Sequence, residues 1–158
     1  MKVTIVLDNI RSAWNVGSIF RSCDALGFEI ILIGYTPRPV GNTLKLIAKT
    51  AIGAENSVKW HYFSHSQEVL QHYHEGEHMA IEISNTSKSI FDFLKSQEFE
   101  IEAEYFFWFG NEIHGLAPSL VAEMKTELHL PMVGKKESLN IANCVCTVGY
   151  LLNYQASF

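Results

Sequence analysis

The sequence has few cysteines and prolines and no compositionally biased segment. Its 158 residues include three Cys and four Pro, and 47% are hydrophobic. The low and odd cysteine count excludes a disulfide scaffold and indicates reduced thiols in a cytoplasmic protein. The apolar content excludes disordered and collagen-like chains. We therefore expect one domain over residues 1–158, long enough to bury a sizeable core.

Three common catalytic or nucleotide-binding motifs are also missing. The sequence contains neither G-x-G-x-x-G nor G-x-x-x-x-G-K-[ST], and it has no G-x-S-x-G segment. The first two absences argue against a standard dinucleotide site and a P-loop. The third argues against a hydrolase of the nucleophile-elbow type.

Signals for export and membrane insertion are weak. The apolar run 1–7 is too short for a signal peptide and leads directly into Asp8. Residues 138–158 contain no Asp, Glu, Lys or Arg, but their Asn and Gln side chains would be costly in lipid. We predict that this segment is a helix buried in the core or against a partner subunit, with no membrane association.

The histidines and the charge distribution leave alternatives open. His61/His65 and His74/His78 have the i,i+4 spacing that can hold a metal on one helix, but each pair extends beyond the expected helix. We therefore expect solvated imidazoles and no metal. Residues 1–60 carry a net charge of +3 and the remainder −8. This asymmetry fits an anion-binding face, and an ordinary uneven surface explains it equally well.

Strand and helix patterns alternate along the chain. Apolar β-branched runs predict strands at 3–7, 29–33, 58–63, 79–83, 105–109 and 128–130. Helical spacing and capping signals predict helices at 16–26, 66–75, 89–94, 118–124 and 138–154. We expect Ser64 and Gln67 to form a capping box, and Ser138 to cap the last helix. This order favours a three-layer α/β domain with a mostly parallel sheet.

Three polar segments each follow an expected strand: residues 9–21, 110–116 and 130–140. Ligands of open α/β sheets bind beyond the carboxyl ends of the strands, so the three together predict a site. Gly110, Gly115 and Gly134 would let a ligand approach the backbone closely. Taken singly, each segment could also be an ordinary turn.

These segments resemble the three motifs of the SpoU/TrmH family, RNA 2′-O-ribose methyltransferases of the SPOUT class. Asn15, Gly17 and Arg21 match N-x-G-x-x-x-R. Residues 110–116 match G-x-E-x-x-G-L, and residues 130–140 match [IL]-P-M-x-G-x-x-x-S-L-N. The segment T-A-I-G-A-E at 50–55 is similar to the family's A-x-G-A stretch. The motifs occur in the family's order and span nearly the whole chain.

The resemblance implies a deep C-terminal trefoil knot, whereas the residues alone favour an unknotted sheet. It implies S-adenosylmethionine bound in a bent pose by the knot loops 110–116 and 130–140. The expected cofactor contacts are Ile81, Gly110, Asn111, Leu130, Met132, Ser138 and Leu139. It also implies a homodimer whose site is completed across the interface, which an uncharged final helix would suit.

The implied reaction transfers a methyl group to a ribose 2′-hydroxyl. Arg21 would act near that hydroxyl as a base, or orient the phosphate and stabilise oxyanion charge; we favour the second because a guanidinium rarely loses its proton. Asn15 would position Arg21 or the ribose, and Glu112 would orient the site and suit a cationic cofactor. Ser138 and Asn140 would fix the loop and the substrate, or cap the last helix.

The expected substrate is RNA, with tRNA favoured because small family members often act on it and ribosomal RNA as the alternative. The basic residues expected to contact phosphates are Arg11, Arg21, Arg38, Lys45 and Lys49. Two further alternatives are a catalytically silent RNA-binding protein of this fold and an unrelated α/β enzyme for a nucleotide or acyl substrate. The motif residues argue against the first, and the missing phosphate loops argue against the second.

Overall fold

A single seven-stranded sheet forms the centre of the molecule. The structure is a computed structural model and describes residues 1–96, 100 and 102–157. The strand order is β3-β2-β1-β6-β4-β7-β5, and every pairing between these strands is parallel. The strands are β1 (Lys2–Asp8), β2 (Glu29–Ile33), β3 (Trp60–Phe63), β4 (Glu77–Ile81), β5 (Lys88–Ser89), β6 (Glu104–Phe109) and β7 (Thr126–His129). The expected parallel α/β sheet is confirmed.

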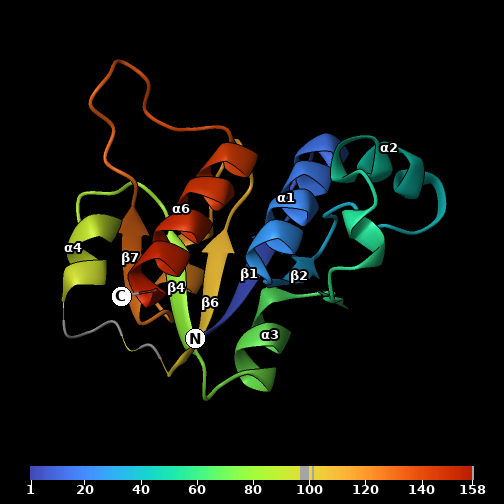
Figure 1. Cartoon of the computed structure of the whole chain (residues 1–158). Helices are drawn as coiled ribbons and strands as arrows, with labels where there is room; N and C mark the ends of the chain where they lie inside the picture. Colours follow the sequence, from blue (N-terminus) through green and yellow to red (C-terminus); the bar gives the residue numbers. More distant parts are fainter. Residues whose placement is uncertain (97–99, 101, 158) are drawn as a thin grey trace.

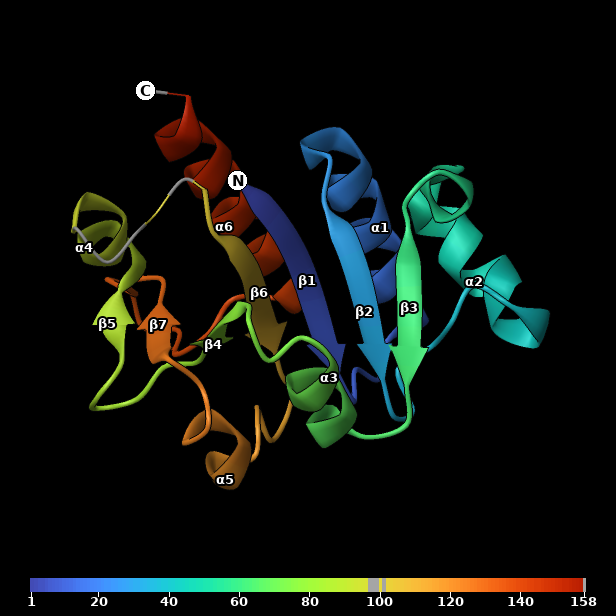
Figure 2. The ribbon, with the colours of Figure 1, turned by 90° about the horizontal axis from the view of Figure 1, so that it is seen from below.

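Helices cover both faces of the sheet and give three layers (Figures 1 and 2). One face packs against α1 (Ala13–Leu26), α4 (Ile90–Lys95) and α6 (Ile141–Ala156), and α2 (Gly41–Ala51) packs on α1. The other face packs against α3 (Ser66–His72) and α5 (Pro118–Val121). Figure 2 shows α1 and α6 behind strands β6, β1 and β2, and α3 in front of them.

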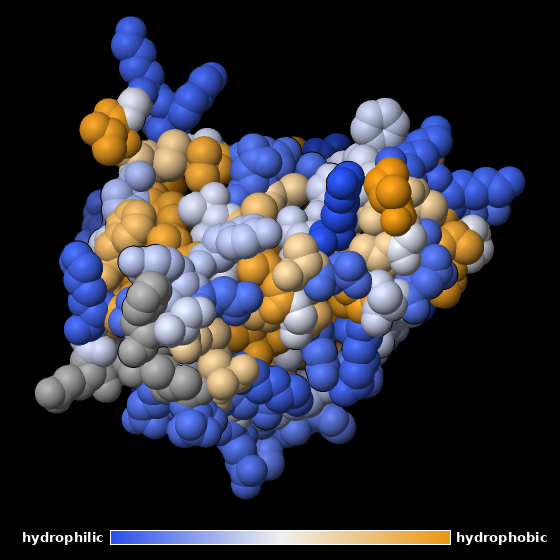
Figure 3. All heavy atoms as spheres, viewed as in Figure 1, coloured by the Kyte–Doolittle hydropathy of each residue, from blue (hydrophilic) through white to orange (hydrophobic). Residues whose placement is uncertain are grey.

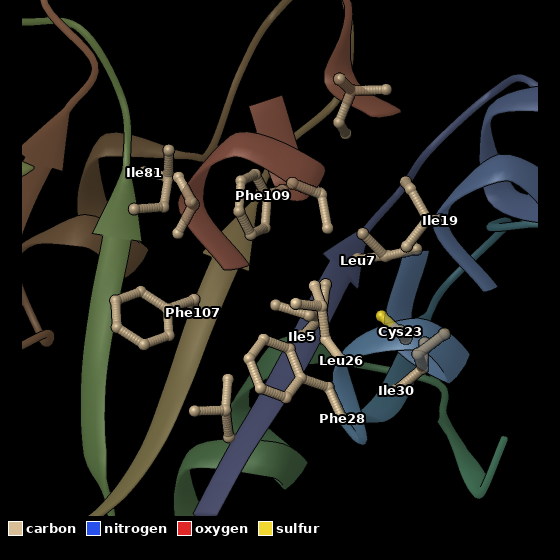
Figure 4. Close-up of a cluster of buried hydrophobic side chains, with 14 of the residues drawn as sticks. Ile5, Leu7, Ile19, Cys23, Leu26, Phe28, Ile30, Ile81, Phe107 and Phe109 are labelled. Atoms are coloured by element: carbon tan, nitrogen blue, oxygen red, sulfur yellow. The ribbon is translucent and has the colours of Figure 1, made fainter. Parts of the chain in front are cut away.

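The central strands are apolar on both sides because both of their faces are covered. In β6, Phe107 faces the α1/α6 layer, whereas Phe106 and Trp108 face the α3/α5 layer. Ile5 and Leu7 of β1 meet Ile19 and Cys23 of α1 in the larger cluster (Figure 4). Each of these side chains is buried, which stabilises the fold by about 1.5–3 kcal/mol for a large aliphatic or aromatic residue.

The caps expected at Ser64 and Ser138 are wrong, whereas Asn140, the alternative cap of the last helix, is confirmed. The helix after β3 begins after His65, and the Ser64 amide donates to the Glu68 carboxylate rather than to Gln67. The last helix begins after Asn140, whose side chain accepts hydrogen bonds from the amides of Ala142 and Asn143. The first buried residue of that helix is Ile141, so packing selects Asn140 over Ser138 as the cap.

Two elements of the structure, α2 and the short strand β5, have no counterpart among the elements expected from the sequence. Val40 provides no side-chain cap for α2, and only Ile47 and Ala51 of this helix are buried. Its apolar stripe is therefore narrow, because the helix packs on α1 and not on the sheet.

His78 is a core residue and not one of a set of solvated imidazoles. The Trp108 indole donates to its Nδ1 at 3.0 Å, so its Nε2 carries the proton and donates to the Tyr73 carbonyl at 2.9 Å. Burial lowers the pKa of His78 against the opposing effect of that carbonyl. Among the described residues, no three His, Cys, Asp or Glu side chains are grouped to hold a metal ion.

Two further expectations concern the whole chain. Within the described ranges, no helix combines the length and the apolar character needed to cross a bilayer. The trefoil knot is a property of how the chain is threaded, which strand order does not test, and it stays a prediction.

Candidate functional site

A pocket of about 820 Å³ opens at the carboxyl ends of β4 and β6, where the second and third polar segments meet. The first polar segment reaches its rim through Asn15. All seven expected cofactor contacts line this pocket, as do Asn15, Glu112 and Asn140. The topology thus brings together residues that are more than a hundred positions apart in the sequence.

Gly110 allows the loop after β6 to fold tightly on itself. A Cβ atom at this position would lie 2.2 Å from the carbonyl carbon of Gly115 and 2.3 Å from the amide nitrogen of Leu116. The Gly115 amide donates to the Asn111 carbonyl at 2.8 Å, and Gly115 has a left-handed backbone with φ of 65°. Both glycines are required by the backbone path, which closes one wall of the pocket.

Glu112 joins the second polar segment to the first. Its carboxylate accepts hydrogen bonds from the amides of Arg11 and Ser12, at 2.9 and 3.2 Å, and from the Asn15 side chain at 3.3 Å. Partial burial raises the pKa of Glu112, but these donors and its own amide outweigh that effect and lower the pKa overall. The carboxylate is therefore ionised and holds the start of α1 in place.

Asn15 and Asn140 extend this network to the third segment. The Asn140 amide donates to the Asn15 side-chain oxygen at 3.2 Å, while the Asn140 oxygen caps α6. A continuous chain of hydrogen bonds thus runs from Glu112 through Asn15 to Asn140. The three polar segments form one hydrogen-bonded unit at the rim of the pocket.

Asn111 lines the pocket, but its side chain has other partners. Its amide donates to the Asn9 carbonyl and to the Tyr35 hydroxyl, and its oxygen accepts from the amides of Ile113 and His114. The residue is buried. A cofactor contact at Asn111 would therefore use its backbone.

The third segment is the most exposed part of the site. Leu130 is buried, whereas Ser138, Leu139 and Asn140 are exposed at the pocket edge. Figure 1 shows this long loop projecting from the sheet between β7 and α6. Ser138 lines the pocket without capping the helix, so its hydroxyl is available to a ligand.

Glu82 is a pocket residue that the sequence analysis missed. It follows β4 directly and its Oε1 accepts the Leu116 amide at 2.6 Å. Burial raises the pKa of Glu82; the Leu116 amide opposes this, and nearby Glu127 adds to it. An acidic residue directly after an apolar strand was the signal that could have identified it.

Arg21 does not line this pocket. It lies in a second, smaller hollow of about 500 Å³ between α1, α2 and α6, together with Lys49, Thr50 and Tyr150. Gly17 of the same motif is a packing residue, because a Cβ atom there would lie 2.2 Å from Thr50 Oγ1 and 2.3 Å from the Ile47 carbonyl oxygen. The three residues of the first motif therefore lie in different places: Asn15 at the pocket rim, Gly17 against α2 and Arg21 in the second hollow.

The other basic residues expected to bind RNA lie on the exposed surface. The Arg38 guanidinium lies 4.2 Å from the centre of the Tyr62 ring, and Arg11, Lys45 and Lys49 are exposed. Within residues 1–96, 100 and 102–157, none of these four side chains forms an ion pair with a carboxylate. They remain available to an anionic partner.

Comparison with known proteins identifies the family. A Bacillus subtilis protein, named for 2′-O-methylation of tRNA cytidine 34, is 28% identical over 140 residues, covering 86% of this chain and 82% of its own. The tRNA (guanosine(18)-2′-O)-methyltransferase of Aquifex aeolicus is 26% identical over 140 residues, 87% of this chain and 62% of its own.

A structural relative supports the fold assignment. The SpoU methyltransferase AviRb of Streptomyces viridochromogenes, solved also with AdoMet, superposes with a TM-score of 0.84 at 22% identity, over 99% of this chain and 60% of its own. The sequence profile of the SpoU rRNA Methylase family matches residues 2–150. The chain therefore belongs to the SpoU rRNA methylase family.

Proposed function

We propose that this protein is an S-adenosylmethionine-dependent methyltransferase that modifies a ribose 2′-hydroxyl of tRNA. One observation carries the proposal: residues from all three family motifs meet at one pocket through the Glu112–Asn15–Asn140 hydrogen-bond chain. A silent RNA-binding protein would not require this arrangement. Residues 1–158 would form a single methyltransferase domain, and the three free cysteines support a cytoplasmic location.

The pocket fits the cofactor in size and chemistry. Its volume of about 820 Å³ lies within the range typical of small-molecule sites. Ile81, Phe109 and Leu130 offer apolar walls for adenosine, and the carboxylate of Glu137 suits a cation. When bound, S-adenosylmethionine supplies an electrophilic methyl carbon attached to a sulfonium. Gly110, Asn111, Met132, Ser138 and Leu139 complete the proposed contacts.

The protein's own groups would orient the acceptor ribose. Glu112 fixes the Arg11–Ser12 backbone and the Asn15 amide, and Asn15 in turn fixes Asn140. This places two amide side chains at the rim, where they would align the hydroxyl with the methyl donor. Ser138, at the same edge, would bind the substrate or hold the loop.

Arg21 would act at a site shared between two copies of the chain. It lies outside the pocket of its own protomer, in the hollow beside Lys49. A homodimer that brings this hollow to the partner's pocket would place the guanidinium near the substrate phosphate, where it would stabilise developing oxyanion charge. The exposed Tyr150 and Tyr154 of α6 and the hydrophobic areas on this face in Figure 3 support an interface here.

The proposed RNA-binding surface consists of Arg11, Arg38, Lys45 and Lys49 together with Arg21. These residues belong to the positively charged first 60 residues. We favour tRNA because the two sequence relatives described above are both named for tRNA methylation, at nucleotides 34 and 18. Binding through such phosphate contacts would weaken as the salt concentration rises.

The test is methyl transfer from labelled S-adenosylmethionine to unmodified tRNA and, separately, to ribosomal RNA. We expect label in tRNA and its loss in Arg21→Ala, with Lys59→Ala as a control because Lys59 pairs with Glu29 away from both hollows. Label in ribosomal RNA alone would overturn the proposed substrate. Cofactor binding without label in either RNA would indicate a silent binding protein.

A further inference from the structure

The Glu82 carboxylate both binds the loop after β6 and faces the pocket. It lies at the carboxyl end of β4, next to Ile81, and lines the pocket. Its Oε1 is engaged by the Leu116 amide at 2.6 Å, and Gly115 lies so close that a Cβ atom there would be 2.6 Å from this oxygen. The carboxylate is thus held firmly between β4 and the loop after β6.

The second carboxylate oxygen of Glu82, Oε2, has no hydrogen-bond partner in the part of the chain that the structure describes. Every buried side-chain oxygen of the described residues has a hydrogen-bond partner. Because Oε2 of Glu82 has none, it is not buried and is accessible. Because Glu82 lines the pocket, this oxygen is open to a bound ligand.

We propose that Glu82 binds the ribose diol of S-adenosylmethionine through this free oxygen. The inference rests on the proposed function, since it assigns a residue to the proposed cofactor. A fixed carboxylate accepts from paired hydroxyl donors, as acidic residues do at the ribose of other nucleotide sites. Its neighbours Ile81 and Leu116 are buried and apolar, which suits adenosine. A charged ammonium would stay better hydrated near Glu137, at the exposed rim.

The electrostatic surroundings favour an acceptor role that depends on pH. Glu127 of β7 and Cys144 of α6 interact with Glu82 electrostatically, and the rim residues Glu112 and Glu137 line the same pocket. Lys88 of β5 pairs with Leu128, whose carbonyl accepts the Glu82 amide, and His129 follows Leu128 in β7. Burial raises the pKa of Cys144 to about 11, so it stays a neutral thiol. Burial also raises the pKa of Glu82, so its protonation begins above the usual range for glutamate. Cofactor affinity should therefore fall on mild acidification.

The test compares ligands that share the ribose but differ in the amino acid part. Calorimetry would give the Kd of S-adenosylmethionine and of 5′-methylthioadenosine for the wild-type protein and for Glu82→Gln. Glutamine can still accept the Leu116 amide, but it loses the charged acceptor. We expect both ligands to bind about 10- to 100-fold more weakly, the range for hydrogen bonds to a charged group. The acid dependence of Kd should be smaller in the variant.

Controls separate this proposal from its alternatives. Glu127→Gln removes a nearby carboxylate that does not line the pocket, and it should bind both ligands as the wild type does. A loss for S-adenosylmethionine with methylthioadenosine unaffected would overturn the diol assignment in favour of the ammonium. Equal affinity in wild type and Glu82→Gln would overturn the proposal alone. No binding of either ligand to the wild-type protein would overturn the proposed cofactor itself.

Discussion

The polar side chains of the site form most of their hydrogen bonds with other groups of the protein. From the sequence, Glu112 suited a cationic cofactor, but in the structure its carboxylate accepts from the Arg11 and Ser12 amides and from Asn15. Asn111 is satisfied in the same way by Asn9, Tyr35 and its own loop. These two motif side chains therefore hold the loops of the site in place through contacts within the protein.

Glu112→Gln should uncouple the first two motifs. The neutral amide has one oxygen for three donors, so Asn15 loses its fixed orientation and methyl transfer should slow by about 10- to 100-fold. The Kd for S-adenosylmethionine should change little. Single-turnover kinetics and calorimetry would check this, with Glu68→Gln as a control that removes a carboxylate bound to one amide elsewhere. Weaker binding of S-adenosylmethionine together with an unchanged rate of methyl transfer would refute this role.

The Glu112 carboxylate should also affect acid stability. Its pKa is lowered in the folded protein, so its stabilising contribution is present above the ordinary glutamate pKa and is lost as the pH falls through the lowered value. The free energy of unfolding of the wild type, measured with urea, should fall as the pH drops through this window. The same curve for Glu112→Gln should be flatter there, and identical pH dependence of the two proteins would count against the assignment.

At the scale of elements, the sequence predicted most strands and helices but not their exact ends. The run Tyr105–Phe109 required a strand covered on both faces, and this is what β6 is. The cap of α6 was misassigned because Ser138 and Asn140 are both good caps, and only the packing of Ile141 distinguishes them. The separation of Arg21 from the pocket depends on topology, which no local pattern encodes.

Asn140 should have two separable roles. Asn140→Ala removes the cap of α6 and should lower the free energy of unfolding by about 1 kcal/mol, whereas Ser138→Ala should leave it nearly unchanged. Asn140→Asp keeps an oxygen for the cap but cannot donate to Asn15. It should therefore retain stability and lose methyl transfer. Full activity of the aspartate variant would show that the Asn15 contact is dispensable.

Gly17→Ala should separate α1 from α2. The new methyl group would collide with Thr50 and with the Ile47 carbonyl, so we expect a loss of about 1–3 kcal/mol in the free energy of unfolding. Ser22→Ala, on the same helix, removes only a hydrogen bond to the Ser18 carbonyl and should be nearly neutral. Equal stability of the two variants in chemical denaturation would contradict this packing role.

For the whole molecule, the proposal requires two chains for each complete site. Arg21 lies in a hollow apart from the pocket that holds Asn15 and Asn140. Mixing Arg21→Ala with Asn140→Ala under conditions that exchange subunits should restore about a quarter of wild-type activity, because half of the dimers are mixed and each has one intact site. Activity that stays at the level of the separate variants would place Arg21 in its own protomer's site.

The chemical position of the transferred methyl group tests the proposed 2′-O-methyltransferase activity most directly. Unmodified tRNA would be incubated with the protein and S-adenosylmethionine, digested to nucleosides and analysed by mass spectrometry. We expect one 2′-O-methylated nucleoside, which should be absent when Asn140→Asp replaces the wild type. A methyl group on a base, or no modified nucleoside despite measured cofactor binding, would contradict it.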